Sequence, residues 1–528
     1  MERHIGVCYI ESEKESKDIG ELIIDGNCIE FYSRFNYLPS KIAFIGQDGN
    51  SNYKIFAEGY LKGEKNGLLT NTLSHRVRYV LMNDFSCSDE TNISGITGFS
   101  FFIPELIDWI GIETVSYRMT KEKKIAAVEK NTPSILIKNS NPKIEIRFKS
   151  YTLEKNFFKE ENEKIISQKP KIYVSYKKPV DVETVTSEIE CLMQFFGLLI
   201  GKVSVAEDII LTAKDKNSNS LLYINHDFSY NLSTQEIIDV PRTYFYILED
   251  NLESYYSNWE SFFQDDDFSL LRRIYFSVNN KREKFQEEVF VEYMRFLDGY
   301  HTRISGDAKT ERDLKEALKD TKKVIKCKIF NDDNRPLFEN AIKQVIPEWN
   351  YNSNNIGDIA EWIASGYLAK TSLSHRLKEL DEKHLSIISH NASNIEKLQP
   401  DYKEKIKNVI KNQKNLREEQ TDELYDELSE DKITAILIEL YYKELGDTRN
   451  YYSHYKNNKT GVLKFSQLSE SIKVLKATII SIFLYHIGLE DMTRKIIAFD
   501  SELYSQTQFL IQENEKPFLS AKEYYENK

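Results

Sequence analysis

The sequence lacks several features that define large classes of proteins. Its 528 residues include only five cysteines, which are scattered and form no C-x-x-C pair. An odd, dispersed set of cysteines argues against a disulfide framework or a zinc site and favours free thiols in a reducing compartment. No stretch reaches the roughly 18 uncharged apolar residues of a membrane span, and the first residues carry no signal-peptide-like apolar run. We therefore expect a cytoplasmic protein without membrane contact.

Positive charge is also scarce, because 83 acidic residues outnumber 71 basic ones and give a net charge of -12. A protein that holds nucleic acid through its phosphates usually presents a basic face. The charge balance excludes a broadly basic surface, so any RNA contact needs a local basic patch.

Common catalytic and metal-binding motifs are missing as well. The chain has no Walker loop, no G-x-S-x-G elbow and no H-E-x-x-H pair. His375, His384 and His390 are nine and six residues apart, and these spacings do not share a helical face. We expect no metal and no cofactor.

The length exceeds what one hydrophobic core usually supports, so we expect at least two domains. Residues from about 5 to 175 contain short strands, with hairpin turns at the Asp-Gly-Asn triplets 25–27 and 48–50. Residues 144–148 alternate apolar and polar side chains, and 171–176 nearly do. These patterns predict an antiparallel sandwich or barrel.

A helix is predicted over residues 181–200, with Gly201 as its stop, followed by strands at 209–211 and 221–224. Between 234 and 241 the pattern changes from strands to helices. We therefore predict an α+β protein with a β-rich domain and packed helix over 1–238 and an all-α bundle over 239–528. Helices are expected at about 243–263, 267–278, 283–303, 309–325, 335–346, 358–379 and 382–396.

The main candidate site follows an amphipathic run that extends from Lys432 to Leu445. Arg449, Asn450 and His454 come directly after this run. They supply a fixed cation, a hydrogen-bonding amide and a side chain that titrates near neutral pH. These groups are sufficient for cleaving RNA without a metal.

Geometry and a second copy of the pattern both bear on this site. On an ideal helix Arg449 points about 140° away from His454, so the two meet only through the long arginine side chain, a local unwinding or a partner subunit. Arg295 and His301 form a similar pair, but Phe296 follows Arg295 where a polar residue is expected. The later pair is therefore preferred over the earlier one. The alternative that Arg449 and His454 are only polar residues at a helix end stays open at this point.

Arg449-Asn450-x-x-x-His454 resembles the R-polar-x(3–5)-H signature of HEPN domains. The layout of the chain is similar to ApeA-type proteins, and segments 101–109 and 195–201 carry that wider likeness. The resemblance implies a C-terminal HEPN bundle, a homodimer with two motifs facing one cleft, and an endoribonuclease of abortive-infection defence against phage. It also implies a β-rich domain that senses a phage-derived trigger or restrains the nuclease, and cellular RNA, tRNA included, as substrate.

In this interpretation His454 takes a proton from a ribose 2′-OH, Arg449 holds the phosphoryl oxygens and Asn450 orients the imidazole or a phosphate oxygen. Tyr451 and Tyr455 are candidates for stacking on bases, with core packing as the alternative. Lys456 and Lys459 are candidates for phosphate contact. Two other functions stay open, namely a non-catalytic HEPN scaffold that binds a protein, nucleotide or RNA, and a carbohydrate or peptide binder that uses the β-rich domain.

Overall fold

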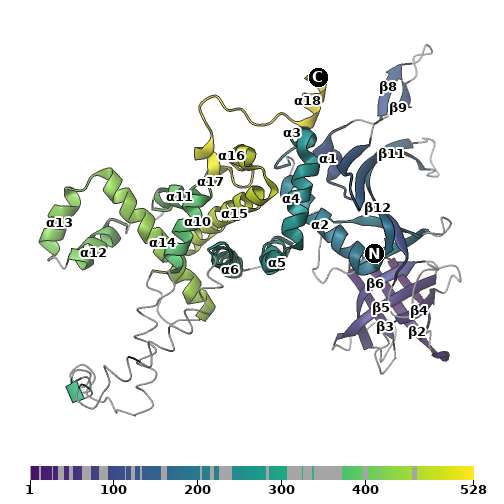
Figure 1. Cartoon of the computed structure of the whole chain (residues 1–528), viewed down its shortest axis with the longest axis horizontal. Helices are drawn as coiled ribbons and strands as arrows, with labels where there is room; N and C mark the ends of the chain where they lie inside the picture. Colours follow the sequence, from purple (N-terminus) through teal and green to yellow (C-terminus); the bar gives the residue numbers. More distant parts are fainter. Residues whose placement is uncertain are drawn as a thin grey trace. The chain divides into compact units, whose positions relative to one another are not determined.

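The structure is a computed structural model, and its elements are drawn in Figure 1. Two compact units can be separated, Met1–Lys284 with Ile480–Lys528 (unit 1) and Phe285–Ile479 (unit 2). The residues that the structure describes are 2–10, 13–25, 28–33, 41–46, 52–61, 73–82, 93–112, 115–119, 125–130, 132, 134–155, 163–202, 205–213, 219–224, 241–280, 285–305, 324, 334, 336–337, 340, 372–396, 402–414, 417–454 and 461–527.

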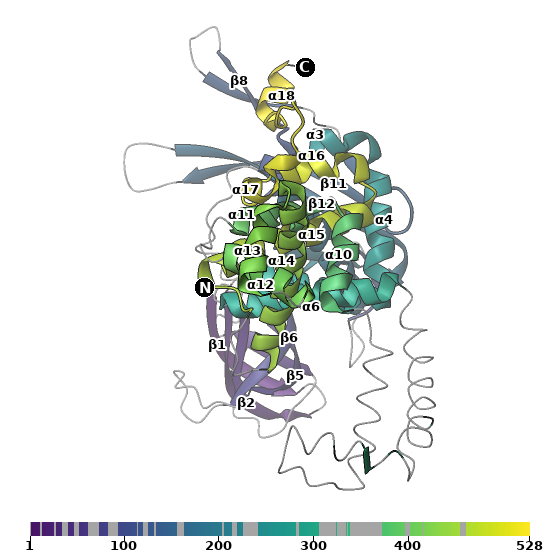
Figure 2. The same cartoon turned by 90° about the vertical axis from the view of Figure 1, so that its left-hand side faces the viewer.

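Unit 1 begins with a closed antiparallel barrel. Among the described strands, six pair in the ring order β6-β3-β2-β1-β4-β5, and β5 closes the ring by pairing with β6 (Figure 1 and Figure 2). Alternate side chains point inward and form an apolar core that includes Cys8, Leu22, Phe31, Phe44, Ile55 and Val80. The strands are β1 (Glu2–Ile10), β2 (Glu13–Asp25), β3 (Cys28–Ser33), β4 (Lys41–Gly46), β5 (Asn52–Leu61) and β6 (Leu73–Met82).

The same strand β6 also starts an open sheet. Its residues 73–76 pair with β3, whereas residues 79–82 pair with β14, so two strands share one of its edges. From β14 the sheet continues in the order β13-β7-β12-β11-β10, and β8 and β9 form a separate hairpin. These strands are β7 (Ile96–Phe102), β8 (Val115–Met119), β9 (Ile125–Glu129), β10 (Ile135–Lys138), β11 (Lys143–Lys155), β12 (Glu163–Val180), β13 (Glu207–Ala213) and β14 (Asn219–Ile224).

The helix that follows the sheet, α2 (Val182–Ile200), has a clear signal at each end. Asp181 caps its first turn by accepting a hydrogen bond of 2.9 Å from the amide of Thr184. Gly201 ends it in the left-handed region with φ of 86°, where an L side chain would be strained. The predicted helix is therefore confirmed in position and in both of its ends.

Further helices of unit 1 pack around Trp259, which is fully buried. Its indole donates a hydrogen bond of 3.1 Å to the carbonyl of Cys191, and its ring meets Phe483 edge-on at 5.9 Å. A buried ion pair of 2.5 Å joins Arg242 to Asp500. The helical elements are α1 (Leu106–Ile110), α3 (Phe245–Leu248), η2 (Glu249–Asn251), α4 (Leu252–Gln264), α5 (Asp266–Asn280), the second part of α15 (Phe465–Ile487), α16 (Glu490–Ala498), α17 (Tyr504–Thr507), η3 (Gln508–Leu510) and α18 (Ala521–Asn527).

Unit 2 is helical in its described residues, and α6, α10 and α14 pack pairwise against one another. Its elements are α6 (Gln286–Ile304), α10 (Leu373–Lys383), α11 (Ile387–Glu396), α12 (Tyr402–Lys414), α13 (Glu418–Asp426), α14 (Glu430–His454) and the first part of α15.

The α+β class is confirmed, and of the two predicted β architectures the barrel is found, extended by an open sheet. The predicted helices at 309–325 and 335–346 lie outside the residues that can be described, apart from isolated positions, and the domain division at 238/239 stays a prediction. None of the described helices is both long and apolar enough to cross a membrane.

The turn from α10 to α11 depends on one buried carboxylate, Asp381. It accepts hydrogen bonds of 2.7 Å from the amides of Ile388 and Ser389 and from the hydroxyl of Tyr442 on α14. Burial raises the pKa of Asp381, although these three donors favour its ionised form. The carboxylate therefore caps α11 and fastens the turn to α14.

We expect Asp381→Ala to destabilise this part of unit 2 by about 3 kcal/mol, because three buried donors lose their acceptor. Two units need not unfold together, so amide hydrogen exchange over α11 is the suitable measurement. Glu382→Ala, at the exposed neighbouring position, is the control and should change exchange little. Equal protection in both variants would contradict the assigned role.

Candidate functional site

The predicted site lies at the C-terminal end of α14, which is anchored in unit 2 by its earlier turns. Leu437, Tyr441 and Leu445 are buried along one side of this helix. The hydroxyl of Tyr441 donates a hydrogen bond of 2.9 Å to Ser471 on α15. These contacts hold α14 against its neighbour and fix the direction of its last turns.

The chain then reverses and packs back onto the end of α14. The amide of Leu463 donates a hydrogen bond of 2.9 Å to the fully buried hydroxyl of Thr448. Gly461 has φ of 78°, and a Cβ there would lie only 2.9 Å from Asp447 Oδ2. The hydroxyl and the glycine therefore fix the start of α15 beside the residues of the motif.

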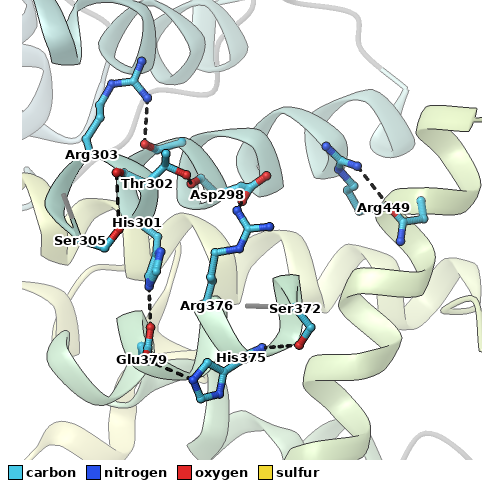
Figure 3. Close-up of polar contacts among 12 residues, drawn as sticks. Asp298, His301, Thr302, Arg303, Ser305, Ser372, His375, Arg376, Glu379 and Arg449 are labelled. Carbon is cyan, nitrogen blue, oxygen red and sulfur yellow. Dashed lines mark hydrogen bonds and ion pairs between the residues drawn. The ribbon is translucent and has the colours of Figure 1, made fainter. Parts of the chain in front are cut away.

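Two of the three predicted catalytic residues are brought together. Arg449 and Asn450 are both half-buried, and the guanidinium donates a hydrogen bond of 3.1 Å from Nη1 to Asn450 Oδ1 (Figure 3). The Nε–H of Arg449 is buried without a hydrogen-bond partner, and no carboxylate of the described residues forms an ion pair with this guanidinium. A half-buried cation with a free donor is suited to an anionic oxygen.

His454 occupies a different face. It is the exposed last residue of α14, and the helix runs unbroken through the motif. The expected angle of about 140° between Arg449 and His454 therefore applies, and local unwinding is not among the ways by which they meet. Their pairing stays a prediction that requires the reach of the arginine or a second protomer.

The other predicted RNA contacts are only partly covered by the structure. Tyr451 is half-buried and its ring meets that of Tyr452 edge-on at 5.0 Å. Burial and the nearby Glu287 raise the pKa of Tyr452. Tyr455, Lys456 and Lys459 lie outside the described residues.

Three lysines of the lysine-rich helix α12 pair with acidic side chains within unit 2. Lys407 pairs with Asp422 on α13, and Lys411 lies 3.3 Å from Glu418. Lys405 pairs with Glu444 on α14. The acidic side chains of α13 and α14 therefore neutralise these three lysines, as expected of solvated helices with opposite charges.

Figure 3 also shows a polar group on α6 and α10 that sequence reasoning did not identify. Glu379 accepts from His301 at 2.6 Å through one oxygen and contacts His375 at 3.2 Å through the other. Arg376 pairs with Asp298 between the same two helices. The spacing of His375 and Glu379 is a helical-face signal, but His301 lies 78 positions from Glu379 and cannot be linked to it from sequence.

The His301–Glu379 contact also decides whether Arg295 and His301, the other Arg–His pair of the sequence, form a site. His301 is buried against Glu379, whereas Arg295 is exposed and pairs with Glu292 at 2.8 Å. The two residues therefore have separate partners, and that copy forms no joint site. Among the described residues no group of three or more His, Cys, Asp or Glu side chains is arranged to hold a metal ion.

The His301–Glu379 contact predicts a pH dependence. The hydrogen bond from His301 lowers the pKa of Glu379 from its ordinary value of 4.5, so the ionised carboxylate stabilises the fold above that value and the contribution is lost as the pH falls. We expect Glu379→Gln to destabilise by less than about 1 kcal/mol at pH 7, because the carboxylate is well exposed. Thermal unfolding at several pH values should show this difference shrinking below the ordinary carboxyl pKa, and a difference that grows would contradict it. Glu382→Gln is the control.

Comparison with known families gives two matches in chain order. Residues 3–259 match the ApeA N-terminal domain 1 family, and residues 391–493 match the Apea-like HEPN family. Neither the curated proteins nor the solved structures gave a match. The HEPN match contains all of α14, including Arg449, Asn450 and His454.

HEPN domains are in general ribonucleases that act on RNA and often dimerise. The first match covers the barrel, the open sheet and α2, and the second covers the helices that carry the motif. With an ApeA N-terminal domain followed by an ApeA-like HEPN domain, the chain belongs to the ApeA type of HEPN proteins.

Proposed function

We propose that this protein is a metal-independent endoribonuclease that acts in abortive-infection defence against phage, with its active site at the end of α14. The observation that carries the proposal is Arg449, a half-buried guanidinium inside the HEPN match with no carboxylate partner among the described residues. The amide of Asn450 and the exposed imidazole of His454 on the same helix supply the remaining groups.

The reaction is a transesterification within the RNA chain. His454 removes the proton of a ribose 2′-OH, and that oxygen forms a bond to the adjacent phosphorus while the bond to the 5′-oxygen breaks. Arg449 stabilises the charge that develops on the phosphoryl oxygens. A second acid protonates the leaving oxygen, which gives a 2′,3′-cyclic phosphate and a 5′-OH end. DNA lacks the 2′-OH and is not cleaved.

A homodimer overcomes the geometry of α14. Within one straight helix Arg449 and His454 point about 140° apart, so a single copy does not place both on one face. A two-fold axis beside the two helix ends lets Arg449 of one protomer and His454 of the other face the same phosphate. In this arrangement one cleft contains both motifs and cleaves cellular RNA, tRNA included.

The acidic charge of the protein limits where RNA binds. The net charge is -12, and three lysines of α12 already pair with acids, so a phosphate chain gains little attraction away from the motif. The nuclease is thereby kept from indiscriminate binding. The β-rich N-terminal domain senses a phage-derived trigger or restrains the nuclease until infection.

The alternative is a non-catalytic HEPN scaffold, which the separation of Arg449 and His454 on one chain would favour. The two functions differ in one measurement. Release of cyclic-phosphate ends that persists in EDTA requires a metal-independent nuclease, whereas a scaffold binds a protein, nucleotide or RNA without releasing them.

We expect His454→Ala to lower RNA cleavage by about 1,000-fold, the usual contribution of a general base, and to abolish toxicity in cells. Sequencing of RNA ends after induction of wild type and variant is the measurement. His375→Ala, at another exposed histidine, should cleave like wild type. Undiminished toxicity of the His454 variant would rule out the assigned base.

Mixed dimers test whether the site is shared. An Arg449→Ala homodimer loses both guanidinium groups, and a His454→Ala homodimer loses both imidazoles, but a dimer of one of each keeps one copy of both. When purified through two different tags, the mixed dimer should cleave at least about tenfold faster than either homodimer. A mixed dimer as inactive as its parents would refute a composite site.

A further inference from the structure

The last two turns of α14 contain a second polar group that lacks a partner. The hydroxyl of Ser453 is buried and has no hydrogen-bond partner among the residues that the structure describes, as is also true of the Nε–H of Arg449. The two residues are four positions apart, so their side chains lie on one face in successive turns. Helical side chains lean toward the N-terminus, which directs Ser453 toward the turn that carries Arg449.

Unpaired buried donors are costly, so two in adjacent turns require an explanation. The two arginines that are buried among the described residues both have acceptors, since Arg242 pairs with Asp500 and Arg272 donates a hydrogen bond of 2.6 Å to the carbonyl of Phe262. The Nε–H of an arginine is only a donor, and a serine hydroxyl can be one. Both groups can therefore be satisfied by an oxygen that carries negative charge.

The helix also leaves open space at Gly446. Gly446 is buried, yet a Cβ built on it would meet nothing within 4 Å. Around the helix axis, Gly446, Arg449 and Ser453 lie within about 60° of one another. The open space at Gly446 therefore lies on the same stripe of the helix surface as the two unpaired donors. A glycine inside a helix lowers the stability of the helix by roughly 1 kcal/mol relative to alanine. At this position it leaves space that the methyl group of an alanine would fill.

We infer that Gly446, Arg449 and Ser453 form a phosphate subsite in which the Nε–H of Arg449 and the hydroxyl of Ser453 donate to non-bridging oxygens of one phosphate. The identification of that phosphate as part of an RNA chain rests on the proposed function. In this subsite Ser453 contacts the substrate directly, and the absence of a side chain at Gly446 leaves space for the phosphate. Asn450, which accepts from Nη1, holds the guanidinium in the orientation that turns Nε toward the stripe.

The test uses full-length protein with His454→Ala, so that RNA is bound but not cleaved. Affinity for a fluorescent single-stranded RNA oligonucleotide is measured by anisotropy, with inorganic phosphate as competitor. Adding Ser453→Ala or Gly446→Ala should each weaken RNA binding roughly tenfold, because a hydrogen bond to a charged oxygen is lost or its space is filled. Ser466→Ala, at an exposed serine of α15, is the matched control and should bind like the parent.

Thermal unfolding separates binding from structure. Removing an unpaired hydroxyl, or replacing a helical glycine by alanine, should leave the unfolding temperature unchanged or raise it. Weaker binding together with equal or higher stability supports the subsite. A lower unfolding temperature for both variants, unchanged RNA affinity, or a parent that binds neither RNA nor phosphate would overturn it.

Failure of this inference can be told apart from failure of the proposed function. If the protein with His454 intact cleaves RNA and keeps its rate and affinity after Ser453→Ala, the subsite is wrong and the nuclease assignment stands. If it cleaves no RNA but Ser453→Ala weakens RNA binding, the phosphate subsite stands and the nuclease assignment is wrong.

Discussion

The straightness of α14 is the constraint on which the candidate site depends. A continuous helix turns by about 100° per residue, so five positions separate Arg449 from His454 by an angle that no side-chain rotation of the histidine removes. The buried Thr448 hydroxyl and the close approach of Gly461 hold the following chain against this end and keep the geometry in place. One face of the helix therefore carries the cation and another carries the imidazole, which is why the proposed mechanism takes the missing partner from a second copy of the chain.

The distribution of charge sets Arg449 apart from the lysines of unit 2. Unit 2 contains many lysines, but Lys405, Lys407 and Lys411 of α12 pair with acids on α13 and α14, which lowers the free positive charge of this helix. Arg449 differs because it is half-buried and lacks a carboxylate among the described residues. An anion that reaches this guanidinium displaces no carboxylate of the described residues. The electrostatic attraction is also stronger at this half-buried position than at the solvent-exposed surface.

Much of the fold could be predicted from local signals, and the rest depended on contacts between distant residues. The Asp-Gly-Asn triplet at 25–27 places a hairpin, and Asp181 with Gly201 marks both ends of α2, because each signal acts over a few residues. The closure of the barrel by β5 and β6, and the double use of β6, have no local signature. At the site, sequence reasoning named Arg449 and Asn450 but assigned Asn450 to the imidazole or a phosphate oxygen, whereas the structure shows it in contact with the guanidinium. Sequence reasoning did not identify Ser453, because burial without a partner becomes visible only when neighbouring helices are in place.

The division of the chain has a consequence for its synthesis. Unit 2 interrupts unit 1, whose last segment begins at Ile480, and the buried pair of Arg242 with Asp500 joins residues 258 positions apart. Because a ribosome releases residues in order, the helical unit can complete its own contacts while unit 1 still lacks its C-terminal helices. The segment that carries Arg449, Asn450 and His454 is thus available to fold before the N-terminal unit is finished. Any restraint that depends on a finished N-terminal unit begins only after the final helices have emerged.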